Sequence, residues 1–331
     1  MTGRIVSLTP VFLFSLPRSG STLLQRLLGA HHRVATTAEP WLLLPFFYAR
    51  RRDGLYAEYN HHAATRAYRD FAETLPRGEE DYEAALHDFA LTLYRQAAGE
   101  TATHFLDKTP RYHLICKHIM RAFPEAKFIF LWRNPLAVMA SMIETWGQGK
   151  WNLYGYKVDL FKGLERLTDA YRDTQRDVYS LRYEDLVRAP TEETEKLFDY
   201  LRISADASVV NAFDHVDFEG QMGDQTGTQR YQCVSNASLH KWKTTFHNPL
   251  RQWWAARYLR WVGPERLRTM GYQLDDLLGS LDGVETRWEK AFSDLVRMGA
   301  GVLYPWVEPN MFRHKWRRRR QTNDRVTVMH R

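Results

Sequence analysis

A short loop between two apolar segments carries the residue types that bind phosphate or sulfate. Residues 11–16 (VFLFSL) predict a buried strand, and residues 23–28 (LLQRLL) predict the first turns of a helix. Between them, residues 17–22 (PRSGST) supply a glycine, three hydroxyls and a fixed cation. Backbone N–H groups at the start of a helix, with the positive end of its dipole behind them, form an anion site. The loop is therefore a candidate phosphate or sulfate site; the alternative is a structural turn without a ligand.

The loop departs from the triphosphate-binding pattern G-x-x-x-x-G-K-[ST]. With Gly20 as the second glycine, the first glycine position falls on Ser15 and the lysine position on Ser21. The next strongly apolar segment, residues 127–132, is followed by Arg133 rather than by the aspartate of a magnesium shell. These differences weigh against a P-loop kinase acting on a small alcohol, which is kept as the alternative enzyme. A non-catalytic anion-binding protein is the other alternative.

A second anion-binding element follows residues 127–132. This segment (KFIFLW) predicts a strand, and residues 136–146 predict a helix with proline near its first turn. Arg133 stands at the carboxyl end of the strand, where open α/β sheets bind ligands. Ser141 lies about two turns into the helix, so an arginine fork and a hydroxyl form a plausible phosphate clamp. Alternatively, the arginine pairs with a carboxylate and the serine fills a helix face.

Together, LPRSGSTLL at 16–24 and FLWRNPLAVMAS at 130–141 resemble the two cofactor motifs of sulfotransferases that use 3′-phosphoadenosine 5′-phosphosulfate (PAPS). The loop arginine is most similar to the branch that includes tyrosylprotein sulfotransferases and many bacterial enzymes. The resemblance covers residues 8–245, and residues 246–331 resemble no known family. It implies PAPS as cofactor, 3′,5′-adenosine bisphosphate as product, a hydroxyl-bearing acceptor as partner and no required metal. The acceptor is a glycan, a small metabolite, a lipid or a peptide tyrosine.

The resemblance also implies cofactor-binding residues. Those that match the positions around the 5′-phosphosulfate are Arg18, Ser19, Gly20, Ser21 and Thr22. Those that match the surroundings of the 3′-phosphate are Arg133, Ser141 and Tyr183. The late loop that closes over the cofactor is matched by Ser235 and Lys243, without the Arg-Lys-Gly run of cytosolic sulfotransferases.

Three residues are assigned to the chemistry by the same resemblance. Glu39 occupies the position of the general base, and Lys108 that of a lysine on the transferring group or leaving phosphate. With Arg18, Lys108 would place positive charge where negative charge builds in the transition state. Without the resemblance, a solvated carboxylate before a proline is the preferred interpretation of Glu39, and the alternative for Lys108 is an exposed pair with Asp107. The next candidates for the base are His240 and a histidine of the loop adjacent to Glu39.

The elements that must position these residues alternate between strand and helix. Beyond the two motifs, helices are predicted at 55–75, 81–98, 112–123, 156–176 and 191–201, and strands at 103–106 and 178–182. This order predicts an α/β fold with a three-layer, P-loop-like parallel sheet flanked by helices, a helical insertion and a C-terminal helical extension. We expect a sulfotransferase domain over 1–282 and a helical extension with a basic tail over 283–331. Residues 218–237 predict a long mobile loop.

Charge is concentrated at the end of the chain. Residues 313–331 hold eight Lys or Arg residues and one acid, a net of +7, which equals the formal charge of all 331 residues. The remainder is near neutral, which argues against a nucleic-acid-binding surface. The basic segment is a candidate contact for an anionic membrane or an acidic partner, or else a solvated terminus. An amphipathic pattern at 288–304 predicts a helix that packs on the domain, broken by residues 304–309.

Composition fits a globular enzyme, with 44% apolar and 14% aromatic residues. No apolar run reaches the length of a membrane span, and residues 11–16 are too short for a signal-peptide core. The expected location is the cytoplasm, with peripheral contact at a membrane surface as the alternative. Aromatic residues at 41–48 and 144–156 line an acceptor pocket or belong to the core. The histidines lack metal-ligand spacing, and sequence alone does not decide whether Cys116 and Cys233 pair.

Overall fold

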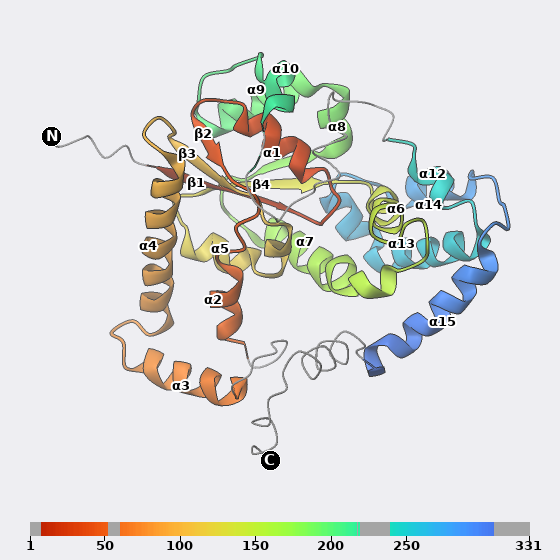
Figure 1. Ribbon diagram of the computed structural model, residues 1–331, viewed down its shortest axis with the longest axis horizontal. Helices are drawn as coiled ribbons and strands as arrows, with labels where there is room; N and C mark the ends of the chain where they lie inside the picture. The colour runs from red at the N-terminus through yellow and green to blue at the C-terminus, as the bar shows by residue number, and fades with distance from the viewer. Residues whose placement is uncertain (1–7, 52–59, 217, 219–238, 308–331) are drawn as a thin grey trace, which may run out of the picture.

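A computed structural model describes residues 8–51, 60–216, 218 and 239–307 (Figure 1). Five parallel strands form one sheet in the spatial order β2-β3-β1-β4-β5. The strands are β1 (Thr9–Ser15), β2 (Val34–Thr36), β3 (His104–Asp107), β4 (Lys127–Trp132) and β5 (Tyr179–Arg182). The loop predicted at 218–237 lies outside the described residues, apart from residue 218.

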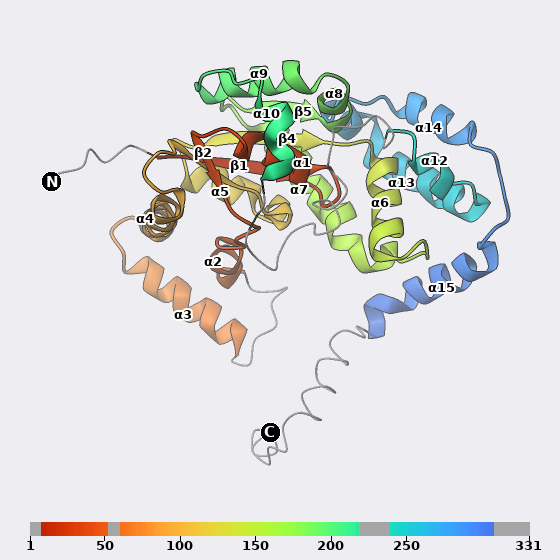
Figure 2. The same cartoon turned by 45° about the horizontal axis from the view of Figure 1, so that its top comes forward.

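Alternate side chains of the central strands divide the core between two helical layers, with the sheet between them (Figure 2). On β1, Val11 and Leu13 face one layer, and Phe12 and Phe14 face the other. The first layer comprises α1 (Ser21–Gly29), α8 (Tyr183–Arg188), α9 (Pro190–Leu201), α10 (Val209–Ala212) and the 3-10 turn η4 (Phe213–His215). The second comprises α4 (Glu79–Ala98), α5 (Cys116–Ala122), α6 (Pro135–Trp146) and α7 (Leu164–Asp173). Parallel strands need both faces covered, and the predicted three-layer α/β fold is confirmed.

The helical insertion lies between β2 and β3. It comprises α2 (Leu44–Ala49), α3 (His61–Glu73) and α4. The side chain of Asn60 accepts a hydrogen bond from the backbone N–H of Ala63, which fixes the start of α3. The first part of the helix predicted at 55–75 lies outside the described residues, and 61–73 is helical as predicted.

Two predicted helices are interrupted at one contact. The segment 112–123 divides into a 3-10 turn, η1 (Pro110–Leu114), and α5, whereas 156–176 begins with η2 (Leu153–Tyr156) and a π-helix, η3 (Val158–Gly163). A Cβ added to Gly163 would lie 2.6 Å from Cε1 of His113. The same imidazole contacts the buried carboxylate of Asp159, with 2.8 Å between Nε2 and Oδ1. The two irregular turns, η1 and η3, therefore approach each other closely at this contact.

The C-terminal part adds α12 (Trp242–Thr245), α13 (Pro249–Thr269), α14 (Leu274–Asp282) and α15 (Ala291–Val307). Both α13 and α14 contribute to the core of the second layer. The break expected at 304–309 is wrong at its start, because α15 continues to Val307. Among the described residues, no helix combines the length and apolarity needed to cross a bilayer. The domain division at 282 stays a prediction.

Candidate active site

Each strand delivers candidate residues to the same edge of the sheet. Because all five strands are parallel, their carboxyl ends lie together, at the edge where open α/β sheets bind ligands. The residues that follow β1 to β5 in turn are the loop 16–20, Glu39, Lys108, Arg133 and Tyr183. Strand order therefore brings together residues separated by more than a hundred positions.

The loop after β1 is shaped by two residues with positive φ. Arg18 has φ 68°, and Gly20, which directly precedes α1, has φ 90°. The first-turn N–H groups of a helix lack intrahelical acceptors, so this loop presents donors to an anion. A Cβ added to Gly20 would lie 2.3 Å from Cδ2 of Tyr183. Only glycine allows the tyrosine ring to approach the loop this closely.

The Arg18 side chain reaches across to α6. Its Nε donates to Oγ of Ser141 and its Nη2 to Oγ1 of Thr145, each over 3.2 Å. Its guanidinium carbon lies 5.9 Å from the ring centroid of Trp146. Ser141 and Thr145 are one helical turn apart, so both hydroxyls lie on the same face of α6. The two predicted phosphate motifs therefore meet through Arg18 and Ser141.

Arg133 braces the loop and keeps one buried donor available. Its Nη1 donates to the backbone carbonyl of Arg18 over 2.8 Å, and its guanidinium carbon lies 4.2 Å from the Tyr183 ring centroid. The side chain is 9% exposed, and its Nε has no hydrogen-bond partner among the described residues. A buried donor without an acceptor is destabilising by about 1–3 kcal/mol. The orphaned N–H fits an anionic ligand such as a phosphate group.

Glu39 and Lys108 form a buried ion pair at the other side of the loop. Lys108 Nζ lies 2.8 Å from Glu39 Oε1, and their side chains are 2% and 11% exposed. The Nε1–H group of Trp41 donates to the other carboxylate oxygen over 3.2 Å. Lys108 is therefore not an exposed partner of Asp107, and Glu39 is not a solvated carboxylate.

Gln25 of α1 positions the segment that carries Glu39. Its amide nitrogen donates to Oγ1 of Thr36 over 2.8 Å and to the carbonyl of Thr37 over 2.7 Å. The Thr36 hydroxyl in turn donates to the carbonyl of Leu106 on β3. These bonds attach the end of β2 both to the helix behind the anion loop and to the strand that delivers Lys108.

Asp107 lies beside Lys108 and forms a separate buried network. Its carboxylate accepts hydrogen bonds from the hydroxyls of Tyr94 (2.6 Å), Thr109 (3.0 Å) and Tyr112 (3.1 Å). Burial raises the pKa of Asp107 to about 6, against the lowering effect of these three donors. Adjacent strand residues point to opposite faces, so Asp107 anchors the end of β3 while Lys108 faces Glu39.

Known proteins of similar sequence identify the family of this chain. The model of the sulfotransferase family matches residues 10–207. The chain belongs to this family. The nodulation protein NoeE of Sinorhizobium fredii is 30% identical over 70% of this chain and 59% of its own length, so the match leaves much of that relative uncovered. A putative protein-tyrosine sulfotransferase of Caenorhabditis briggsae is 24% identical over 71% of this chain and 81% of its own.

The fold agrees with that of a solved family member. A sulfotransferase domain from the curacin biosynthetic pathway superposes with a TM-score of 0.50 and 22% identity, over 73% of this chain and 92% of that domain. The resemblance predicted from the two motifs is therefore confirmed at the level of family and fold.

Of the two residues predicted for the late loop over the cofactor, the described part of the chain contains Lys243 alone. Ser235 lies outside the described residues. Lys243 is exposed on α12, and its Nζ lies 6.0 Å from the ring centroid of Trp242. No hydrogen bond or ion pair between described residues joins Lys243 to the anion loop. His240, the reserve candidate for the base, is exposed.

Sequence reasoning missed three residues of the site: Gln25, Trp41 and Thr145. Thr145 follows Ser141 by one turn, a spacing that would have identified it once Arg18 was known to reach α6. Gln25 and Trp41 act through contacts that arise only in the folded chain. No group of three potential metal ligands is found within the described part of the sulfotransferase. Cys116 is buried, and Cys233 falls outside that part.

Proposed function

We propose that this sulfotransferase moves a sulfuryl group from PAPS to an acceptor hydroxyl, with Glu39 as the general base. The observation that carries the proposal is the buried Glu39–Lys108 pair at the sheet edge that also holds the anion loop. A base, a cation and an anion site converge there, and sulfuryl transfer needs all three.

The cofactor-binding residues fit the two ends of PAPS. When bound, PAPS supplies the sulfuryl group from its 5′-phosphosulfate. The N–H groups of the loop and Arg18 would hold that end, and Arg133 would donate its buried Nε–H to the 3′-phosphate. Ser141 would act mainly by orienting Arg18, since its hydroxyl already accepts from that guanidinium. Tyr183 would complete the wall beside Arg133.

Glu39 would accept the proton of the acceptor hydroxyl. Trp41 and Lys108 each donate to one of its oxygens, so the carboxylate is held in a single orientation. Lys108 can exchange its bond to Glu39 for one to an oxygen that becomes negative during transfer. As Glu39 becomes neutral on accepting the proton, this exchange leaves the buried ammonium with an anionic partner.

Thermal unfolding with three ligands tests the proposal. We expect 3′,5′-adenosine bisphosphate to raise the Tm well above the effects of ATP with Mg²⁺ and of inorganic sulfate, because only a ligand bound to the native state stabilises it. Stabilisation by ATP and Mg²⁺ alone would favour the kinase alternative. Stabilisation by sulfate alone would favour a non-catalytic anion-binding protein.

The acceptor can be sought with labelled PAPS. Incubation with a lysate of the native host, followed by separation of labelled products, should show transfer into one class of hydroxyl compound. The Glu39→Gln variant is the matched control, because it should bind the bisphosphate but transfer label about 10²–10⁴ times more slowly. Labelling at the wild-type level by this variant would mean that a residue other than Glu39 is the general base.

A further inference from the structure

The helix α15 presents its apolar side to solvent. The outward residues Phe292, Leu295, Val296 and Val302, here called the α15 face, are 81%, 57%, 57% and 69% exposed. They recur at intervals of three, one and six residues, which places them on one stripe of the helix. Figures 1 and 2 both show α15 at the periphery, away from the sheet. A solvent-exposed stripe is normally polar, so this face is suited to an apolar environment.

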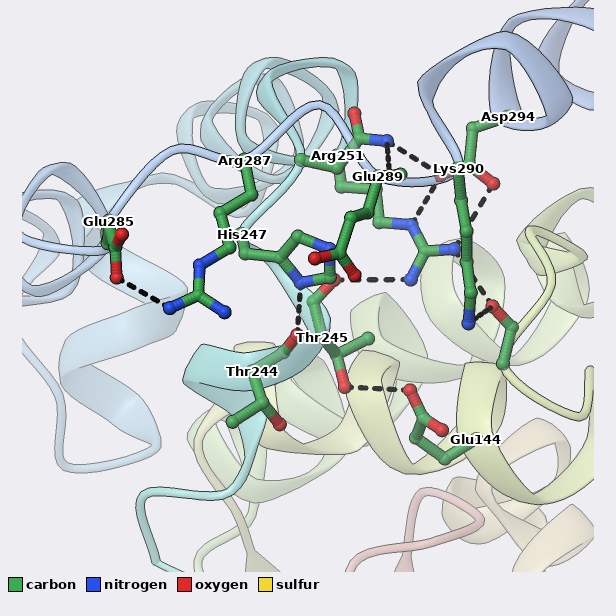
Figure 3. Close-up of polar contacts among 12 residues, drawn as sticks. Glu144, Thr244, Thr245, His247, Arg251, Glu285, Arg287, Glu289, Lys290 and Asp294 are labelled. Carbon is green, nitrogen blue, oxygen red and sulfur yellow. Dashed lines mark hydrogen bonds and ion pairs between the residues drawn. The ribbon is translucent and has the colours of Figure 1, made fainter.

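A polar anchor holds α15 in this orientation (Figure 3). Asp294, on the inner side, receives bonds from Nε of Arg251 over 2.6 Å and from its Nη2 over 3.1 Å. Asn248 adds a bond to the same carboxylate, and Arg251 also donates to the carbonyl of Gly149. Asp294 and Arg251 are 0% and 1% exposed. The buried pair fixes α15 against α13, so its apolar stripe is held outward.

A groove between α13 and α15 extends the apolar surface. Its volume is about 820 Å³, and its lining includes Trp253, Trp254, Trp288, Leu295, Lys157 and Arg257. Trp253 and Trp288 are 57% and 75% exposed. Tryptophan is enriched where proteins meet the headgroup region of a bilayer. The two cations at the groove would stand beside anionic headgroups.

The distribution of charge around α15 also favours contact with the headgroup region of a bilayer. Within 291–302, whose side chains the structure describes, the sole carboxylate is Asp294, which is buried in the anchor. Beside Trp288, the exposed carboxylate of Glu289 is followed directly by the exposed cation of Lys290. The chain segment that begins six residues after α15, at Arg313, carries a net charge of +7. A second copy of the chain would carry the same net charge of +7 and be repelled, whereas an anionic bilayer would attract a chain of this charge.

We propose that the α15 face, with Trp253 and Trp288, docks on an anionic lipid bilayer, assisted by the basic segment at 313–331. Apolar burial and attraction to anionic lipid together give stable interfacial binding. The proposal is independent of sulfuryl transfer, since none of its residues belongs to the proposed site.

Vesicle flotation of the full chain tests the proposal. We expect flotation with vesicles of phosphatidylcholine and phosphatidylglycerol, little with phosphatidylcholine alone, and a decrease as NaCl is raised. The double variant Phe292→Glu/Leu295→Glu should bind at least about tenfold more weakly. The matched control is Phe71→Glu/Leu93→Glu, which adds the same charges at exposed positions on α3 and α4 and should float like wild type.

Two further measurements make the outcome decisive. Stabilisation of each variant by 3′,5′-adenosine bisphosphate shows that its fold and cofactor site are intact. Light scattering in solution reports the oligomeric state of wild type and of the α15 variant. The proposal is overturned if wild type does not float with anionic vesicles, if the α15 variant floats equally well, or if that variant instead dissociates a dimer.

Discussion

The ammonium of Lys108 lies 2.8 Å from the carboxylate of Glu39, although 69 residues separate them in the chain. The motif resemblance gave these two residues separate roles, one on the acceptor and one on the leaving group. Their contact means that each controls the charge seen by the other. Substitutions at either position therefore change stability and chemistry together, and experiments must separate the two effects.

The Glu39→Gln variant should lose both stability and turnover. It leaves the buried Lys108 cation without a counter-charge, which destabilises by about 3–5 kcal/mol. Loss of a general base lowers the rate by about 10²–10⁴. Urea unfolding and labelled sulfuryl transfer measure the two effects. The double variant Glu39→Gln/Lys108→Met removes the unpaired charge, so it should regain most of the stability and none of the activity. Recovery of activity in the double variant would reduce the pair to a structural role.

Arg133→Ala should weaken binding of 3′,5′-adenosine bisphosphate by about 10–150-fold, the loss of one charge-assisted hydrogen bond worth about 1.5–3 kcal/mol. Calorimetric titration measures the change. Because Arg133 also braces the carbonyl of Arg18, a general loosening of the loop must be separated from loss of the phosphate contact. Adenosine 5′-monophosphate, which lacks the 3′-phosphate, provides that comparison.

The Arg133→Ala variant should lose much of its preference for 3′,5′-adenosine bisphosphate over adenosine 5′-monophosphate. Ser141→Ala should weaken binding of the bisphosphate by only a few-fold, since the Ser141 hydroxyl contacts Arg18. Arg172→Ala, an exposed arginine of α7, serves as the control and should bind like wild type. If Arg133→Ala kept the same preference for the bisphosphate, Arg133 would not be a ligand of the 3′-phosphate.

Gly20→Ala should weaken cofactor binding far more than Gly99→Ala. Both glycines have positive φ, 90° and 69°, and Gly99 has ψ −162°, a backbone region that is essentially limited to glycine. The backbone strain of about 1–3 kcal/mol at Gly99 is therefore at least as large as that at Gly20. Only at Gly20 would the new Cβ meet the Tyr183 ring, whereas nothing lies within 4 Å at Gly99. Overpacking adds about 1–3 kcal/mol and displaces the ring from Arg133. Thermal unfolding should show a loss of stability in both variants, whereas bisphosphate titration should show a loss of affinity in the Gly20 variant alone. Equal effects of the two substitutions on affinity would contradict the packing of Tyr183 on Gly20.

The parts of the fold that local patterns determine were predictable. Residues 11–16 and 127–132 are apolar runs, and both are central strands of the parallel sheet. The helix predicted at 136–146 is found at 135–146, beginning one residue earlier, at its proline. Glu39 and Lys108 entered the site through family resemblance, because nothing in their neighbours marks them as paired.

Other features depend on contacts that no local pattern contains. The π-helix at 158–163 exists where Gly163 meets His113, two residues from different elements. The amphipathic pattern at 288–304 correctly indicates a helix but not which face packs on the protein. In α15 the inward face combines Asp294, buried in its pair with Arg251, with Met298, which packs on the core, and the most exposed apolar residues lie on the other side. Hydrophobic periodicity identifies an apolar stripe on a helix, but contacts with residues distant in the sequence determine whether that stripe faces the core or the solvent.

Titration of Asp107 should lower the free energy of unfolding as the pH rises from mildly acidic to neutral. Its pKa is raised from 3.8 to about 6 in the folded protein, so the native state binds the proton more tightly than the unfolded chain does. The stabilisation is fully present below about pH 4 and is lost as pH rises through about 6, a change of about 3 kcal/mol for two pKa units. Asp107→Asn cannot titrate, so its stability relative to wild type should rise over the same interval.

Urea unfolding at a series of pH values measures this difference. Asp173→Asn is the matched control, because Asp173 is exposed and its pKa is lowered by bonds to Lys117 and Arg172. The contribution of Asp173 is lost as pH falls, the opposite direction to Asp107. A flat difference between wild type and Asp107→Asn would mean that the three hydroxyl donors keep Asp107 ionised. The end of β3, and with it Lys108, would then be anchored by a carboxylate at every pH tested.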